Sequence, residues 1–147
     1  MTDQRNIIKD YPHGTFPRIR QRRTRRSDWQ RRMVRETKLD ADDLIWPAFV
    51  IGGDNKREPV ATMPGVERLS IDQLINEAKR ARGLGIPAMA VFPVIDDVHK
   101  DESGSAATQQ DNLVCQAITE VKSAVPDIGV IADVALDPFT SHGHDGI

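Results

Sequence analysis

The segment from residue 133 to residue 146 holds the side chains best suited to chemistry in this 147-residue sequence. Three carboxylates, Asp133, Asp137 and Asp145, occur there together with two histidines, His142 and His144. Carboxylates can transfer protons and are hard oxygen ligands suited to Mg²⁺, whereas histidines can bind a transition metal. The spacing leaves two interpretations open: a metal or proton-transfer site, or a turn at Asp137 with hydrogen-bonded loop histidines.

Strands and helices alternate ahead of this segment and must position it. Nearly continuous apolar runs predict strands over residues 44–51, 87–92 and 128–134, the first of them buried on both faces. Apolar residues at helical spacing predict two helices, one beginning after Ser70 and one near Leu113. The remaining connections are predicted as loops, with a turn at 63–66 and a long polar loop over 95–108.

The alternation of three strands with two helices, joined by short connections, predicts an α/β fold with a parallel sheet. Asp133 then lies at the carboxyl end of the last strand, where such folds carry their active sites. The first strand is not followed by a Gly-x-Gly-x-x-Gly motif, which disfavours a dinucleotide-binding fold. The competing eight-stranded barrel needs about 250 residues, so under that alternative Ile147 is expected to be a point of truncation.

Residues 1–40 are polar, lack periodicity and are strongly basic. The stretch 18–35 has nine arginines against one acid and carries +8, whereas the rest of the chain carries −10 of the overall −2. Such a split indicates a basic arm on an acidic body, with a short helix predicted from Ser27 through Val34. The arm could bind the phosphates of a nucleic acid or an acidic neighbouring subunit. It contains no helix-turn-helix, zinc-knuckle or aromatic stacking pattern, which favours the subunit.

The amino-acid composition indicates in which cellular compartment the protein is expected. The single cysteine, Cys115, excludes an intrachain disulfide framework and fits a reducing environment. No apolar run approaches the ~20 residues that span a bilayer, and the N-terminus shows no apolar signal segment. We therefore expect a soluble cytoplasmic protein with no membrane partner.

Read as a whole, the segment 133–146 resembles the metal-site segment of porphobilinogen synthase (δ-aminolevulinic acid dehydratase). The resemblance extends from about Arg18 to Ile147, and several motifs in the same order make it specific. The other motifs that carry it are Val34-Arg35-Glu36-Thr37, Asp42-Asp43-Leu44-Ile45, Met63-Pro64-Gly65-Val66-Glu67-Arg68-Leu69-Ser70, Leu84-Gly85-Ile86-Pro87-Ala88, Phe92-Pro93, Lys100-Asp101 and Gly104-Ser105.

The resemblance implies a fold and an activity. Residues 41–147 are expected to be the first three β/α units of a (β/α)₈ TIM barrel, an incomplete domain preceded by an extended basic arm over 1–40. In the family this arm embraces a neighbouring subunit, usually in a homo-octamer. The implied enzyme is a hydro-lyase that condenses two molecules of 5-aminolevulinate to porphobilinogen with loss of water, in the synthesis of haem and other tetrapyrroles.

The resemblance also implies roles for the carboxylates. Asp133 corresponds to an active-site aspartate of the family, and we expect it to transfer a proton or to orient the substrate amine. Zinc-dependent members carry three cysteines where this chain has Ala135, Asp137 and Asp145, which indicates the zinc-independent type that uses Mg²⁺ or a monovalent cation. Asp137 and Asp145 are then expected to bind substrate or metal.

The family's two Schiff-base lysines lie on later barrel strands, and no lysine of this chain matches either position. Lys79 and Lys122 fall on predicted helices, where a solvated face is the simpler interpretation. Lys100 lies in the polar loop without matching a catalytic position. We therefore expect this chain alone to be inactive.

Two other classes of protein remain as alternatives. A metal-dependent hydrolase would use His142-x-His144 as zinc ligands, although barrel enzymes resembling amidohydrolases place such a pair after the first strand, and here it follows the third. A nucleic-acid-binding module would act through the arginine arm, with an affinity that falls steeply as salt rises.

Overall fold

A computed structural model describes residues 17, 20 and 22–146, so the predicted arm is described only in part. The chain divides into two units, Met1–Lys38 and Leu39–Ile147. Among the helices of the described residues, none combines the length and the apolar character that crossing a membrane requires.

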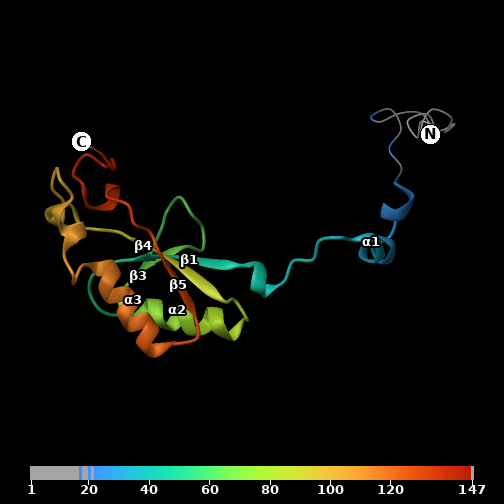
Figure 1. Ribbon diagram of the computed structural model, residues 1–147, viewed down its shortest axis with the longest axis horizontal. Coiled ribbons are helices and arrows are strands. Elements are labelled where there is room, and N and C mark those ends of the chain that lie inside the picture. Colours follow the sequence, from blue (N-terminus) through green and yellow to red (C-terminus); the bar gives the residue numbers. More distant parts are fainter. Residues whose placement is uncertain (1–16, 18–19, 21, 147) are drawn as a thin grey trace, which may run out of the picture. The chain divides into compact units, whose positions relative to one another are not determined.

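A sheet of five strands, in the order β2-β3-β1-β4-β5, forms the centre of the second unit (Figure 1). β1 (Ile45–Val50), β4 (Ala88–Pro93) and β5 (Gly129–Ala132) confirm the three predicted strands. β4 pairs in parallel with β1 on one side and with β5 on the other. The predicted α/β fold with a parallel sheet is confirmed, and the carboxyl ends of these three strands meet at one edge of the sheet.

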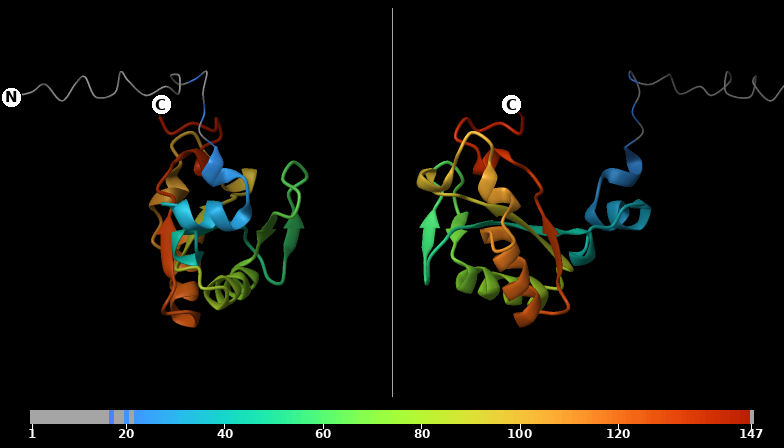
Figure 2. Two further views of the ribbon diagram at one scale, coloured as in Figure 1. Left: turned by 90° about the vertical axis from the view of Figure 1, so that its right-hand side faces the viewer. Right: turned by 60° about the vertical axis from the view of Figure 1, so that its left-hand side comes forward.

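Two helices cover one face of this sheet (Figures 1 and 2). They are α2 (Ile71–Gly83) and α3 (Leu113–Ala124), and they confirm the two predicted helices. Each presents an apolar stripe to alternate residues of the strands, because a helix with apolar residues three and four apart has one apolar face. The buried core comprises Ala48, Val50, Leu69, Leu74, Ala78, Ala81, Ile86, Met89, Val91, Ala117, Val121, Val125 and Ile128.

The opposite face of the sheet is open. Its residues include Ile45, which is 55% exposed, and Ile131, which is 47% exposed. The rings of Phe49 and Phe92 lie on the same face with their centroids 6.2 Å apart. Within the second unit, no helix or strand of the described residues packs on this face. The prediction that the first strand is buried on both faces is therefore wrong for this chain: the strand is apolar on both faces, but helices pack against only one.

Residues 52–69, predicted as a loop, contain a β-hairpin. β2 (Arg57–Pro59) pairs antiparallel with β3 (Glu67–Leu69), and β3 pairs in parallel with β1. The predicted turn at 63–66 closes the hairpin, with Gly65 in the left-handed region at φ +82°. Strands of three residues with charged side chains show no alternation of apolar and polar residues, so the sequence pattern did not indicate them.

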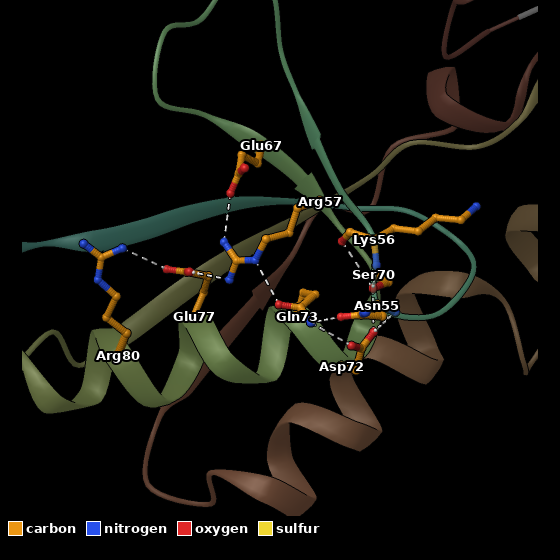
Figure 3. A network of polar contacts seen from close by, with 9 residues as sticks. All are labelled: Asn55, Lys56, Arg57, Glu67, Ser70, Asp72, Gln73, Glu77 and Arg80. Carbon is orange, nitrogen blue, oxygen red and sulfur yellow. Dashed lines mark hydrogen bonds and ion pairs between the residues drawn. The ribbon is translucent and has the colours of Figure 1, made fainter.

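Arg57 fastens this hairpin to α2 (Figure 3). Its Nη1 donates to Glu67 Oε2 at 2.8 Å, its Nη2 to Glu77 Oε1 at 2.8 Å and its Nε to Gln73 Oε1 at 2.9 Å. Arg80 approaches the second oxygen of Glu77 at 3.4 Å. Because the side chain of Glu77 is only 12% exposed, its ion pair with Arg57 is better shielded from water than a surface pair.

The start of α2 is tied to the same hairpin (Figure 3). Ser70 is the N-cap, but its hydroxyl accepts from Lys56 N at 2.9 Å and lies 2.5 Å from Asp72 Oδ1. Gln73 Nε2 donates to Asn55 Oδ1 at 2.9 Å. The polar residues around the N-cap therefore connect α2 to the hairpin instead of closing a capping box on α2 itself.

The described part of the first unit contains the short helix α1 (Asp28–Val34). It begins after Ser27, as predicted, and the Ser27 hydroxyl donates to Gln30 Oε1 at 2.9 Å. No residue of α1 is buried: Trp29 is 61% exposed and Met33 is 77% exposed. The described residues of the first unit therefore provide no core for this helix.

The three bonds of Arg57 lead to a prediction on stability. We expect Arg57→Met to lower the free energy of unfolding by about 1–3 kcal/mol, because Glu77 would keep only the more distant of its two arginine partners while staying largely shielded from water. Urea unfolding followed by far-UV circular dichroism measures this change. Arg68→Met, on the neighbouring strand, is the matched control, since Arg68 makes no side-chain hydrogen bond or ion pair with the described residues. Equal losses of unfolding free energy in the two variants would contradict a stabilising role for the three bonds of Arg57.

Candidate functional site

Asp133 lies at the carboxyl end of β5. Its backbone N–H donates to Val91 O at 3.4 Å, so pairing with β4 continues one residue beyond the strand. Because successive residues of a strand alternate between faces, Asp133 follows Ile131 on the open face of the sheet. The prediction that Asp133 stands at the carboxyl end of the last strand is confirmed, whereas its catalytic role stays a prediction.

Asp145 folds back on the loop that follows β5. Its Oδ1 accepts the backbone N–H of Leu136 at 2.7 Å and that of Asp137 at 2.9 Å. These two residues begin the short 3₁₀ turn η6 (Asp137–Phe139). The amide of Asp137, then that of Leu136 and the charge of His144 lower the pKa of Asp145. The structure thus brings Asp145 to the start of the turn that carries Asp137, while its Oδ2 receives no hydrogen bond from the described residues.

The two histidines are engaged with their own loop and its neighbour. His142 Nδ1 accepts the backbone N–H of His144 at 3.2 Å, so the ring proton is on Nε2, which lies 3.0 Å from Glu102 O and donates to it. The two rings stack with centroids 5.9 Å apart. Since both ring nitrogens of His142 already have partners, this arrangement disfavours the alternative in which His142 and His144 bind zinc together.

The donor set for a metal ion is incomplete in this chain. Carboxylates have the right chemistry for Mg²⁺. However, the described residues bring no three histidine, cysteine or acidic side chains close enough to hold one ion. The residues present therefore do not form a complete metal site by themselves.

Thr140 and Asp101, for which the sequence predicted no role, connect the loop after β5 with the loop after β4. Thr140 is 4% exposed, and its hydroxyl donates to His144 O at 3.0 Å. Asp101 pairs in parallel with Thr140 through an isolated β-bridge. The motif containing Asp101 was visible in the sequence, but its partner lies 39 residues further along the chain, and no local pattern indicates such a contact.

A cavity of about 370 Å³ lies at the carboxyl ends of β1 and β4. Its wall includes Gly52 after β1, Ile95 and Asp96 after β4, Leu113 at the start of α3 and Phe139 of η6. This volume is within the range of small-molecule sites, and the edge of the sheet is where parallel folds place them.

Two lysines have other partners: Lys100 in the loop after β4, and Lys122, which contacts the chain just before the amino end of β5. Lys100 Nζ lies 2.9 Å from Asp97 Oδ1, and its side chain is 25% exposed. Lys122 Nζ, on α3, donates to Pro126 O at 2.5 Å and to Ile128 O at 2.8 Å. Neither resembles a buried amine poised for Schiff-base formation. The absence of a Schiff-base lysine from the whole chain stays a prediction.

A parallel sheet with helices on its outer face and carboxylates at its carboxyl edge is the arrangement of part of an α/β-barrel enzyme. The family model for delta-aminolevulinic acid dehydratase matches residues 18–147. The chain therefore belongs to the delta-aminolevulinic acid dehydratase family, hydro-lyases of porphyrin synthesis that use metal ions.

Relatives and a solved structure agree with this assignment. The chain is 60% identical over 129 residues to delta-aminolevulinic acid dehydratase of Bradyrhizobium diazoefficiens, covering 88% of this chain and 36% of the relative. The Synechocystis enzyme is 46% identical, over 89% of this chain and 39% of its own. The crystal structure of the Toxoplasma gondii enzyme in complex with porphobilinogen superposes with a TM-score of 0.81 at 40% identity, over 88% of this chain and 36% of the other. The chain thus spans little more than a third of the length of these relatives.

The amides around Asp145 lead to a prediction on its titration. Because they stabilise the ionised carboxylate, we expect the pKa of Asp145 to lie below the ordinary value of 3.8. The stabilisation is then present above pH 3.8 and is lost as the pH falls through the lowered pKa. NMR titration of the Asp145 carboxyl carbon measures this, with Asp145→Asn to assign the signal. A midpoint at or above 3.8 would contradict the geometry.

Proposed function

We propose that this chain supplies the N-terminal part of a porphobilinogen synthase, which condenses two molecules of 5-aminolevulinate to porphobilinogen with loss of water. The observation that carries the proposal is the position of Asp133 at the carboxyl end of β5, on the open face of the sheet, in a chain 60% identical to a named dehydratase. Alone, the chain is expected to make no porphobilinogen, because the proposal places both Schiff-base lysines outside it.

Asp133 would act on the substrate amine. An ionised carboxylate at this position can accept a hydrogen bond from the ammonium group and hold it toward the open face, where the second substrate molecule must also bind. The same carboxylate can take up a proton as the amine becomes a nucleophile. Both roles need the carboxylate at the end of β5, and the pairing of Asp133 N with Val91 O fixes the backbone there.

Asp137 and Asp145 would bind the substrate or a cation beside it. Asp145 uses Oδ1 for the turn η6 and has Oδ2 available for a ligand. The carboxylates stand where zinc-dependent members carry cysteines, which supports the zinc-independent type with Mg²⁺ or a monovalent cation. Since the described residues bring no three ligands together, any ion would need further ligands from outside this part of the chain.

The first unit would bind a neighbouring copy of the protein. α1 exposes Trp29, Met33 and Val34, and an apolar surface of this kind on a short helix favours a protein partner over a nucleic acid. The basic charge of the arm complements the acidic remainder of the chain. We therefore propose a homo-oligomer formed through the arm.

The role of Asp133 can be tested in a fusion of this chain with the remaining part of the Bradyrhizobium diazoefficiens relative. We expect the fusion to form porphobilinogen from 5-aminolevulinate, and Asp133→Asn to lower kcat about 100-fold or more, the size typical of a lost proton-transfer group. Asp127→Asn is the matched control, because Asp127 precedes β5 at its opposite end and its side chain bonds, within the described part of the chain, only Arg82, at 2.6 Å. An inactive fusion that is folded, or full activity of Asp133→Asn, would contradict the proposal.

The arm makes a separate prediction. We expect replacement of Trp29 and Met33 by Gln to shift the fusion to a smaller oligomer, measured by light scattering after size exclusion, because α1 would lose the apolar surface that its partner covers. Arg32→Gln is the control, since it removes one exposed charge without apolar area. If the arm instead binds nucleic acid, the oligomer would stay unchanged and affinity for DNA would fall with salt.

A further inference from the structure

The carboxylate of Asp101 organises a tight turn in the loop between β4 and α3. Its Oδ1 accepts the backbone N–H groups of Ser103 at 2.9 Å and Ser105 at 3.0 Å, and also the Ser103 hydroxyl at 2.9 Å. Its Oδ2 accepts the Ser105 hydroxyl. These donors, the hydroxyl and amide of Ser105 foremost, hold the pKa of Asp101 far below its usual range. The carboxylate therefore stays ionised, and the turn stays closed, across the physiological pH range.

The backbone of this turn is joined to the loop that follows β5. Asp101 N donates to Phe139 O at 3.3 Å, and Ser141 N donates to Asp101 O at 2.9 Å. Gly104 adopts φ +64° against Thr140, where an added Cβ would lie 3.2 Å from Thr140 Cγ2. The Nε2 of His142 adds its bond to the carbonyl of the neighbouring residue 102. Three hydrogen bonds, and the close approach of Gly104 to Thr140, therefore join residues 101–104 to residues 139–142.

The loop after β5 connects these contacts with the candidate site. Thr140 exchanges two hydrogen bonds with the backbone of His144, through its hydroxyl to His144 O at 3.0 Å and from His144 N at 3.2 Å. The next residue, Asp145, closes the loop onto the amides of Leu136 and Asp137. Hydrogen bonds linked by short stretches of backbone thus connect the turn at Asp101 to the Asp145 carboxylate and to the backbone amide of Asp137.

We propose that Asp101 is a positioning residue: by folding the turn 101–105 it holds the segment 139–142, and through that segment it sets Asp137 and Asp145. Among the described residues its carboxylate bonds only Ser103 and Ser105, so its effect on the site is expected to pass through the backbone bridge. The meaning of this role rests on the proposed function of the two carboxylates. The geometric part can be tested on the 147-residue chain itself.

The test is backbone amide exchange by NMR in Asp101→Ala. We expect exchange at least ~10-fold faster at Ser103 and Ser105, the direct partners, and also at Ser141, Leu136 and Asp137, which the carboxylate does not touch. Amides of the β4 core, such as that of Met89, should keep their rates. Asp97→Ala is the matched control, because the Asp97 carboxylate lies in the same loop, is 95% exposed and has Lys100 as its only ion-pair partner in the part of the chain that the structure describes.

The outcomes separate a positioning role from a local one. Faster exchange confined to Ser103 and Ser105 would overturn the proposal, since Asp101 would then shape only its own turn. If the Ala variant also loosens the core, Asp101→Asn decides: its amide oxygen still accepts the two N–H groups but loses the charge and one hydroxyl partner. We expect it to give intermediate rates at the distant amides, and rates equal to the wild type there would overturn the proposal.

The fusion enzyme distinguishes a failure of this proposal from a failure of the proposed function. In an active fusion we expect Asp101→Ala to lower kcat ~10-fold or more, Asp101→Asn to restore part of it, and Asp97→Ala to leave it unchanged. Disturbed exchange with unchanged kcat and KM would overturn the positioning role while leaving the function intact. A folded fusion that is inactive before any substitution would overturn the proposed function, and the exchange rates would still decide whether Asp101 sets the two carboxylates.

Discussion

The parallel pairing of β1, β4 and β5 is the constraint on which the rest of the structure depends. It aligns the carboxyl ends of the strands at one edge, so the loops after β4 and β5 meet there although about forty residues separate them. The same pairing assigns alternate residues to two faces. The helices bury one of these faces, while the other carries Asp133 among apolar neighbours.

The carboxylates of this edge differ in what their hydrogen bonds do. Asp101 has its acceptor sites filled by serine hydroxyls and amides, which makes it a structural anion. Asp145 has one oxygen held by amides and one available. Asp133 is exposed at the end of a strand whose backbone is fixed. Backbone hydrogen bonds order this loop before a ligand binds. The loop therefore loses less conformational entropy on binding, and its carboxylates can orient an amine.

The sequence was sufficient to predict the elements whose patterns are local. Apolar runs located the three parallel strands, helical spacing located α2 and α3, and Ser27 located the start of α1. The hairpin β2–β3 was missed, because its stability comes from Arg57 and from pairing with β1, neither of which leaves a periodic signal. The open face was missed for a related reason: an apolar strand predicts that both faces can be buried, but not that both have a partner. The candidate site carboxylates were chosen by residue type and position, and their roles stay predictions, whereas the hydrogen bonds of Asp145 to Leu136 and Asp137, and the bridge from Asp101 to Thr140, depend on tertiary structure.

We propose that this chain supplies carboxylates to an enzyme that forms Schiff bases through lysines outside residues 1–147. Borohydride trapping with 5-aminolevulinate tests it most directly, because reduction converts a Schiff base into a stable mass tag on the lysine that formed it. In the fusion with the Bradyrhizobium diazoefficiens remainder, peptide mapping should place the stoichiometric adduct entirely outside residues 1–147, and the isolated chain should carry none. A stoichiometric adduct on one lysine of this chain would contradict that placement of the lysines and would show that residues 1–147 themselves form the Schiff base.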